Sequence, residues 1–234
     1  MCKFATVVKP DEDSIKTAKD IQKYLFNNGL SYSESNPDIV CVIGDNSTLT
    51  TAVHRYIRRL DQMEFVLLPK YDEELLNRII TQTGNIEEIR LLRITLKGNP
   101  SRVYLALNET TVYNETVCDY EIIIDGRSLG YGQGKGIAIA TSYSQRLNAA
   151  VDKTLEAIQL NVVENTKGNY LPVVLNGNRC LTIKSDFSQS TLNFDGYHLA
   201  LNNTEEIEFT LGVQALRLAH YENRENNQNL YEPW

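Results

Sequence analysis

The stretch from Asp38 to His54 constrains the fold of this 234-residue chain more than any other. Ile39 to Ile43 is a run of five apolar, mostly β-branched residues, which is typical of a buried parallel strand. Gly44 to Ser47 follow as a short turn, and Ser47 or Thr48 can cap the next helix. Backbone N–H groups and the helix dipole favour an anion where a strand, a tight turn and a helix N-terminus meet. The stretch therefore predicts either a phosphate-binding turn or a βα turn without a ligand.

Strands and helices alternate through the N-terminal part of the chain. Phe4 to Val8 and Glu64 to Leu68 have the apolar pattern of further short strands. Helices are predicted from Ser14, as the N-cap, to Asn27 and from Tyr71 to Ile80, because their apolar residues recur at helical spacing. This alternation predicts a parallel sheet with helices on both of its faces.

The pattern changes near residue 85 to short strands separated by Gly, Asn and Pro. Helical periodicity is found again only around Leu147 to Leu160. Strands are predicted at Arg90–Lys97, Arg102–Leu107, Thr116–Ile124, Lys135–Ala140, Leu171–Leu175, Cys180–Lys184, Ser190–Phe194, Glu206–Leu211 and Ala215–Ala219. We therefore expect an α/β + all-β chain. It would have an N-terminal α/β domain with a parallel sheet (1–90), a C-terminal β-sandwich domain (91–220), and a polar tail (221–234) that can return to the N-terminal domain.

Composition excludes several classes of function. A net charge of −7 and a sequence pI of about 5.1 argue against nucleic acid or an anionic membrane as the main partner. The four cysteines are far apart, which suggests neither a metal site nor a disulfide framework. No apolar stretch approaches the roughly 20 residues that span a bilayer, and the start lacks a signal-peptide apolar region. We therefore expect a soluble, cytoplasmic protein without a bound metal.

Three further motifs could carry chemistry. Asn108-Glu109 places an amide and a carboxylate side by side at a strand end, where they could bond a base edge and a ribose hydroxyl, although Asn-Glu is also common in turns. Gly134-Lys135-Gly136 allows close approach to the backbone and leads into the hydroxyl-rich segment Thr141 to Ser144. A β-bulge and turn would explain these glycines without a ligand. Asp195-Gly196 has the sequence of a hairpin turn.

Taken in order, these motifs resemble those of the NAD kinase family, whose members phosphorylate the 2′-hydroxyl on the adenosine ribose of NAD. The similar segments are Asn36-Pro-Asp-Ile-Val40, Gly44-Asp-Asn-Ser-Thr-Leu49, Tyr104-Leu-Ala-Leu-Asn-Glu109, Gly134-Lys-Gly136 with the residues after it, and Asp195. The resemblance covers almost the whole chain. It implies NAD or NADP bound in a cleft between the two domains, ATP with Mg²⁺ as phosphoryl donor if the protein is active, and a homodimer or homotetramer. The nucleotide-binding positions that it implies are Gly44, Ser47, Thr48, Asn108, Glu109, Gly134, Lys135, Gly136, Thr141, Ser142, Tyr143, Ser144 and Asp195.

The departures from the family pattern concern catalysis. The family's catalytic Asp aligns with Asn46, and Asp45 replaces a glycine. Asn matches the shape of Asp but cannot accept the proton, so Asp45 would have to act as the base in an active enzyme. Lys135 replaces an acidic residue, and Leu147 or Asn148 stands where the family has the Tyr that stacks on adenine.

Three alternatives therefore remain open beside an active kinase. The changed residues favour a non-catalytic binder of NAD(P) with weakened or lost phosphoryl transfer. A scaffold or interaction protein that keeps only the fold is the second alternative. A lipid kinase is the third, and the acidic composition and the intact Asn108-Glu109 pair argue against it.

Overall fold

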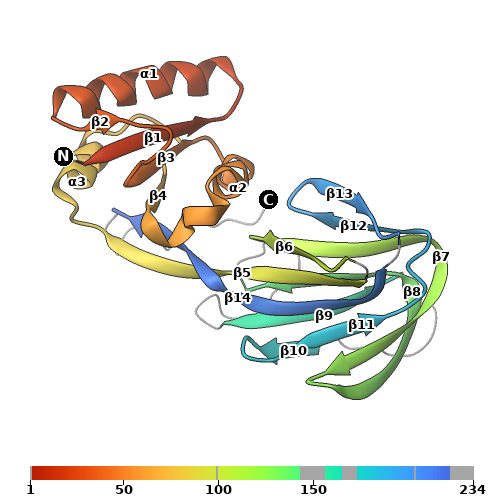
Figure 1. Cartoon of the computed structure of the whole chain (residues 1–234). Helices are drawn as coiled ribbons and strands as arrows, with labels where there is room; N and C mark the ends of the chain where they lie inside the picture. The colour runs from red at the N-terminus through yellow and green to blue at the C-terminus, as the bar shows by residue number, and fades with distance from the viewer. Residues whose placement is uncertain (1, 99, 143–155, 165–172, 203, 222–234) are drawn as a thin grey trace. The chain divides into compact units, whose positions relative to one another are not determined.

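The computed structural model describes residues 2–98, 100–142, 156–164, 173–202 and 204–221 (Figure 1). These residues form two compact units. The first contains the described residues up to Ile89 and from Gln214 onward, and the second contains those between Arg90 and Val213. The chain is thus an α/β unit followed by a β-rich unit, with its last described residues back in the first.

The first unit is built on a parallel sheet. Its strands are β1 (Lys3–Val8), β2 (Ser31–Tyr32), β3 (Ile39–Ile43), β4 (Glu64–Leu67) and the end of β14 (Thr204–His220). They lie in the order β2-β1-β3-β4-β14, and every neighbouring pair is parallel. This arrangement confirms the parallel α/β architecture predicted from the alternating pattern.

Helices cover both faces of this sheet. They are α1 (Glu12–Asn27), α2 (Asn46–Arg55), the 3₁₀ helix η1 (Ile57–Gln62) and α3 (Glu73–Thr81). Buried residues of α1 and α3 form one core cluster with Ile39 and Cys41 of β3. Tyr56, which ends α2, packs edge-on against Phe65, and Phe65 pairs with Val40 of β3. Because neighbouring strand residues point to opposite faces, α2 lies on the face opposite α1 and α3.

The helix N-caps differ from the predicted ones. Asp11 caps α1 by accepting a hydrogen bond from Ser14 N, and Asp45 caps α2, so neither Ser14 nor Ser47 or Thr48 is the cap. Asp and Ser are similarly favoured as N-cap residues. In both helices the N-cap is the earlier residue, the Asp, whose backbone is extended. The caps were therefore predicted two or three residues too late.

The second unit is an antiparallel β-sandwich. Its strands are β5 (Asn85–Gly98), β6 (Arg102–Ala106), β7 (Glu109–Ile124), β8 (Arg127–Thr141), β9 (Ala157–Val163), β10 (Val173–Asn176), β11 (Leu181–Lys184), β12 (Ser190–Phe194) and β13 (Tyr197–Ala200), with the first part of β14. The long β7–β8 hairpin continues through β9 to β10, and the other edge of β7 pairs with β12 and β11. Side chains from almost every strand enclose one hydrophobic core.

Two predicted elements of this region were wrong. Ala157 to Leu160 were expected to end a helix, but they lie in β9; the rest of Leu147–Leu160 up to residue 155 is outside the described residues. All four side chains are buried, so the alternation that would have indicated a strand is hidden. The two strands predicted at Glu206–Leu211 and Ala215–Ala219 are one strand, β14, and its end belongs to the first unit rather than the second. Among the described residues, no helix has both the length and the apolar character needed to cross a membrane.

Candidate functional site

The turn between β3 and α2 depends on Gly44. Its φ is +149°, which side-chain-bearing residues rarely adopt. A Cβ at this position would lie 2.4 Å from Thr48 Oγ1 and 2.9 Å from Lys9 Cβ. Glycine is therefore required here by the tightness of the turn.

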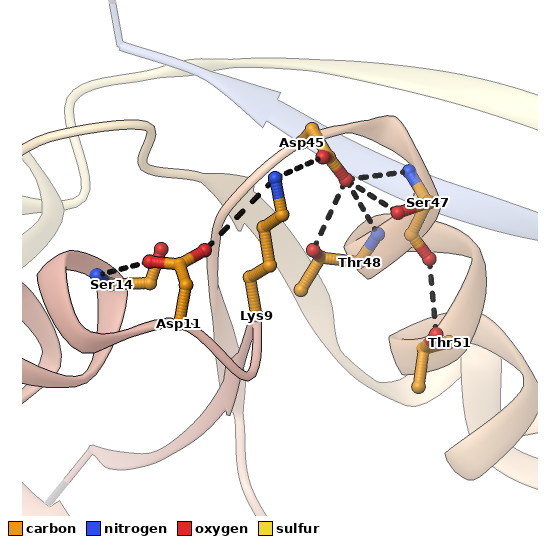
Figure 2. Close-up of polar contacts among 7 residues, drawn as sticks. All are labelled: Lys9, Asp11, Ser14, Asp45, Ser47, Thr48 and Thr51. Atoms are coloured by element: carbon orange, nitrogen blue, oxygen red, sulfur yellow. Dashed lines mark hydrogen bonds and ion pairs between the residues drawn. The ribbon is translucent and has the colours of Figure 1, made fainter.

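Asp45 directs its carboxylate back onto the first turn of α2 (Figure 2). Its Oδ1 accepts hydrogen bonds from Ser47 N at 3.0 Å, Ser47 Oγ at 2.6 Å, Thr48 N at 3.2 Å and Thr48 Oγ1 at 3.2 Å. Its Oδ2 lies 3.0 Å from Lys9 Nζ, which is itself 4.0 Å from Asp11 Oδ2. The chain's own carboxylate thus occupies the N–H groups that would otherwise be available to an external anion.

These contacts determine the protonation of Asp45. The hydrogen bond from the Ser47 hydroxyl and then the one from the Lys9 ammonium hold the pKa of Asp45 far below its ordinary value. The same hydrogen bond raises the pKa of Lys9. A carboxylate with so low a pKa is a weak base, because proton abstraction is most efficient when the pKa of the base is near the operating pH. Asp45 is therefore poorly suited to replace the base that the sequence resemblance implies.

Asn46, at the position of the implied catalytic Asp, is the exposed first residue of α2. Its main-chain oxygen accepts a hydrogen bond from Thr50 Oγ1 at 3.0 Å, as part of the helix. An amide side chain has no site that takes up a proton at neutral pH. Of the two residues only Asp45 carries a group that can take up a proton, and its contacts with Ser47 and Lys9 hold the pKa of that carboxylate low.

Sequence reasoning missed Lys9, although a signal for it existed. Lys9 directly follows β1, as Gly44 directly follows β3, and Val8 pairs with Ile43. Because parallel strands end at the same edge of a sheet, the residue after one strand lies beside the turn after its neighbour. The order β1-β3 was not visible from the sequence, and with it Lys9 could have been placed beside Asp45.

In the second unit, hydrogen bonds hold the backbone of the Asn108-Glu109 segment, which lies where β6 ends and β7 begins. The two carboxylate oxygens of Asp195 accept hydrogen bonds from the backbone N–H groups of Leu107 at 2.6 Å and Asn108 at 3.2 Å. The side-chain amide of Asn108 lies 3.5 Å from Asp195 Oδ1. Asp195 and Gly196 have φ values of +46° and +84° and join β12 to β13, as the predicted hairpin turn requires. The hairpin turn is confirmed, and the carboxylate of Asp195 positions the Asn108-Glu109 segment.

Thr141 also forms hydrogen bonds to the backbone of this segment. Its N–H donates to Asn108 O at 3.1 Å, and its hydroxyl is 3.2 Å from Leu107 O. Glu109 pairs with Ala140 at the end of β8, so Glu109 is next to Thr141 across the ladder. Ser142 directly follows Thr141 in a turn, whereas Tyr143 and Ser144 are outside the described residues. Segments from three parts of the sequence therefore meet at Asn108-Glu109.

Gly134, Lys135 and Gly136 are not part of this cluster. A Cβ on Gly134 would lie 2.5 Å from Val163 O, and one on Gly136 would lie 2.5 Å from Val112 O, so packing within the sheet requires both glycines. Lys135 Nζ forms an ion pair with Glu164 Oε2 at 3.0 Å, and a bulge in β7 lies opposite it. Gly136 is five residues from Thr141 along β8, which is about 16 Å at the rise of a strand. The β-bulge interpretation accounts for these three residues.

The described part of the chain contains no group of three or more His, Cys, Asp or Glu side chains arranged to hold a metal ion.

The two units together have the architecture of the NAD kinase fold. Yeast NADH kinase, solved in complex with NADH, superposes with a TM-score of 0.83 at 13% identity, covering 96% of this chain and 85% of that one. An NAD kinase from Archaeoglobus fulgidus, solved in complex with ATP, superposes with a TM-score of 0.77 at 16% identity, covering 97% and 96%.

The sequence comparison identifies the family. The NAD kinase of Geobacillus stearothermophilus is 30% identical over 250 residues, covering 93% of this chain and 91% of the relative. NAD kinase 1 of Bacillus anthracis is 27% identical over 249 residues, covering 94% of this chain and 93% of the relative. No protein-family model matches the chain. The chain belongs to the NAD kinase family.

Proposed function

We propose that this chain binds NAD(P) at Asn108-Glu109 and that its phosphoryl transfer from ATP to NAD is weak or lost. The observation that carries the proposal is the set of hydrogen bonds by which Asp195 and Thr141 hold the backbone next to this pair. A binding group that is held in place before its ligand arrives loses little conformational freedom on binding.

The two side chains suit the adenosine part of a dinucleotide. A carboxylate such as that of Glu109 accepts hydrogen bonds from ribose hydroxyls, and an amide such as that of Asn108 both donates to and accepts from a base edge. Both residues are partly buried, so bonds to a ligand there are less exposed to water. The NADH bound to the yeast relative supports a ligand of this class.

The Asp45 turn supports the second part of the proposal. ATP is bound by the Archaeoglobus fulgidus relative, and ATP with Mg²⁺ is the donor proposed for any residual transfer here. In this chain the Asp45 carboxylate adds a negative charge at the N-terminus of α2 and occupies the N–H groups of Ser47 and Thr48. A triphosphate would have to displace this contact. Asp45 and Asn46 also offer no efficient general base. Loss of a general base slows phosphoryl transfer by about 10²–10⁴-fold.

The binding proposal is tested by thermal unfolding of the purified chain with NAD and NADP. A ligand that binds only the folded state raises the melting temperature. We expect a rise with the wild type, a smaller rise with Glu109→Ala, and an undiminished rise with the control Glu115→Ala, which removes an exposed carboxylate from the same strand. Absence of a shift at millimolar dinucleotide would overturn the proposal and favour a scaffold that keeps only the fold.

Phosphoryl transfer is tested separately by incubating the protein with ATP, Mg²⁺ and NAD and measuring NADP. We expect little NADP from the wild type and no further loss in Asp45→Ala. Efficient NADP formation that Asp45→Ala abolishes would show that Asp45 acts as the base despite its contacts.

A further inference from the structure

Three neighbouring strands of the second unit carry a row of side chains that begins with Glu109. Glu109 of β7 pairs with Ala140 of β8, and Ala140 pairs with Gln159 of β9 (Figure 1). Residues directly opposite one another on neighbouring strands point to the same face of a sheet. Ile139 and Leu160, one residue away on β8 and β9, belong to the hydrophobic core. The row of Glu109, Ala140 and Gln159 therefore lies on the face turned away from that core.

Gln159 is a buried polar residue in this row. It is only 8% exposed, and its side-chain amide forms no hydrogen bond with any other residue that the structure describes. Burying a polar group without a hydrogen bond destabilises a protein, so such a group needs an explanation. Of the polar side-chain atoms in the described part of the chain, only Thr204 Oγ1 is both fully buried and unpartnered, so the Gln159 amide remains within reach of solvent. The amide is therefore available to a ligand.

Ala140 leaves room between the two polar side chains of the row. Two strand spacings separate the backbones of Glu109 and Gln159, or about 10 Å, and the residue between them carries only a methyl group. Glu and Gln side chains are of equal length, so a small polar group above Ala140 can contact both. A carboxylate only accepts hydrogen bonds, whereas an amide both donates and accepts them. The two vicinal hydroxyls of a ribose match this combination, because each hydroxyl can donate and accept.

We propose that Gln159 is a further ligand-binding residue, whose amide forms a hydrogen bond to the ribose that Glu109 binds. The inference rests on the proposed function, because it adds a residue to the same dinucleotide site. In this arrangement the two vicinal hydroxyls of the adenosine ribose lie above Ala140, and each polar side chain bonds one of them. The amide gains its hydrogen bond when the ligand binds, which offsets in the complex the cost of burying the amide in the free protein.

The substitution Gln159→Met in the full chain separates binding from folding, because Met is unbranched like Gln and has no amide. Replacing an unpaired buried amide should leave the free energy of unfolding in urea unchanged or higher. The affinity for NAD, measured by calorimetry, should fall about fivefold, as expected for one ordinary hydrogen bond. Gln133→Met is the matched control, because the amide of Gln133 bonds Asp119 Oδ1 at 2.9 Å, seven residues before Ala140 on β8. This control should keep the wild-type affinity.

Two NAD analogues, each lacking one hydroxyl of the adenosine ribose, locate the contact. One of them should bind the wild type and Gln159→Met with equal affinity, because the hydrogen bond is absent in both complexes. If both analogues still bind the variant more weakly, the amide does not contact this ribose, and the inference is overturned.

The remaining outcomes separate the two proposals. If the wild type binds neither NAD nor NADP, the proposed function fails. If the wild type binds NAD and Gln159→Met binds it equally well, Gln159 is not a ligand-binding residue. If Gln159→Met lowers the free energy of unfolding together with the affinity, or if Gln133→Met loses as much affinity, the effect arises from the packing of the unit, and the inference is again overturned.

Discussion

Replacing Asp195 by Asn tests whether the Asn108-Glu109 segment is held in place by one carboxylate. Asn has nearly the same shape and tolerates the positive φ of +46° found at this position, so the turn itself is preserved. What changes is the acceptor: Asp195 uses both oxygens, one for Leu107 N and the other for Asn108 N, and Asn offers only one oxygen.

The expected loss of stability follows from these two bonds. Leu107 is 1% exposed, so its N–H group would lose its partner away from water, at a cost of about 1–3 kcal/mol. The remaining bond would change from a charged to a neutral acceptor, which costs about 1 kcal/mol more. We therefore expect the free energy of unfolding to fall by about 2–4 kcal/mol, and the affinity for NADP to fall at least about tenfold because the binding pair is no longer held.

The assay combines urea unfolding with calorimetric titration of NADP. Asp125→Asn is the matched control: Asp125 also has a positive φ of +48°, precedes Gly126 in the β7–β8 hairpin, and accepts a backbone bond, from Cys180 N at 2.9 Å. It should destabilise the protein as well, but it lies in a different turn and should leave the NADP affinity unchanged.

Two results would refute the reasoning. One is an unchanged free energy of unfolding in Asp195→Asn, since the two bonds would then contribute nothing. The other is an equal loss of NADP affinity in both variants, since the effect would then reflect general destabilisation rather than the position of Asn108-Glu109.

Three further predictions concern separate parts of the chain. Asn46→Asp restores a carboxylate at the family's catalytic position and should raise NADP formation from ATP and NAD by about 10²-fold or more; an unchanged rate would show that the missing base is not what limits transfer. Gly44→Ala should lower the free energy of unfolding by more than about 2 kcal/mol, because of the positive φ and the contact with Thr48, and a neutral effect in urea would contradict this. Burial raises the pKa of Tyr120 from 10.0 to about 12, so its neutral form is favoured in the folded state. Its contribution to stability should be complete below pH 10 and lost as the pH rises towards 12. Tyr120→Phe should therefore show a smaller alkaline loss of stability than the wild type, and an equal loss would contradict the assignment.

The β3–α2 region was predictable because its signals are local. Five apolar residues, a glycine turn and an apolar helical face lie within one short stretch, and each indicates its own element. The position of the cap was not predictable to the residue, because Asp45, Ser47 and Thr48 are all good caps and the choice depends on backbone geometry. The contact of Asp45 with Lys9 depends in addition on which strands are neighbours.

The convergence at Asn108 was predictable only in part. The family resemblance indicated Asn108, Thr141 and Asp195 as members of one site, but local patterns gave no reason for them to touch. Their contacts arise from the register of β7 with β8 and β12, which is set by side chains far apart in the sequence. The same register explains why a side chain at Gly134 or Gly136 would meet the backbone of a neighbouring strand, a packing requirement that the sequence alone did not show.

Binding at Asn108-Glu109 can be seen in a crystal structure of the chain soaked with NADP. We expect the adenosine ribose to be hydrogen-bonded to Glu109 and the base edge to lie at Asn108, with Asp195 and Thr141 still holding the backbone of that pair. Crystals that take up no dinucleotide at millimolar concentration, or a dinucleotide bound elsewhere with Asn108 and Glu109 untouched, would contradict it.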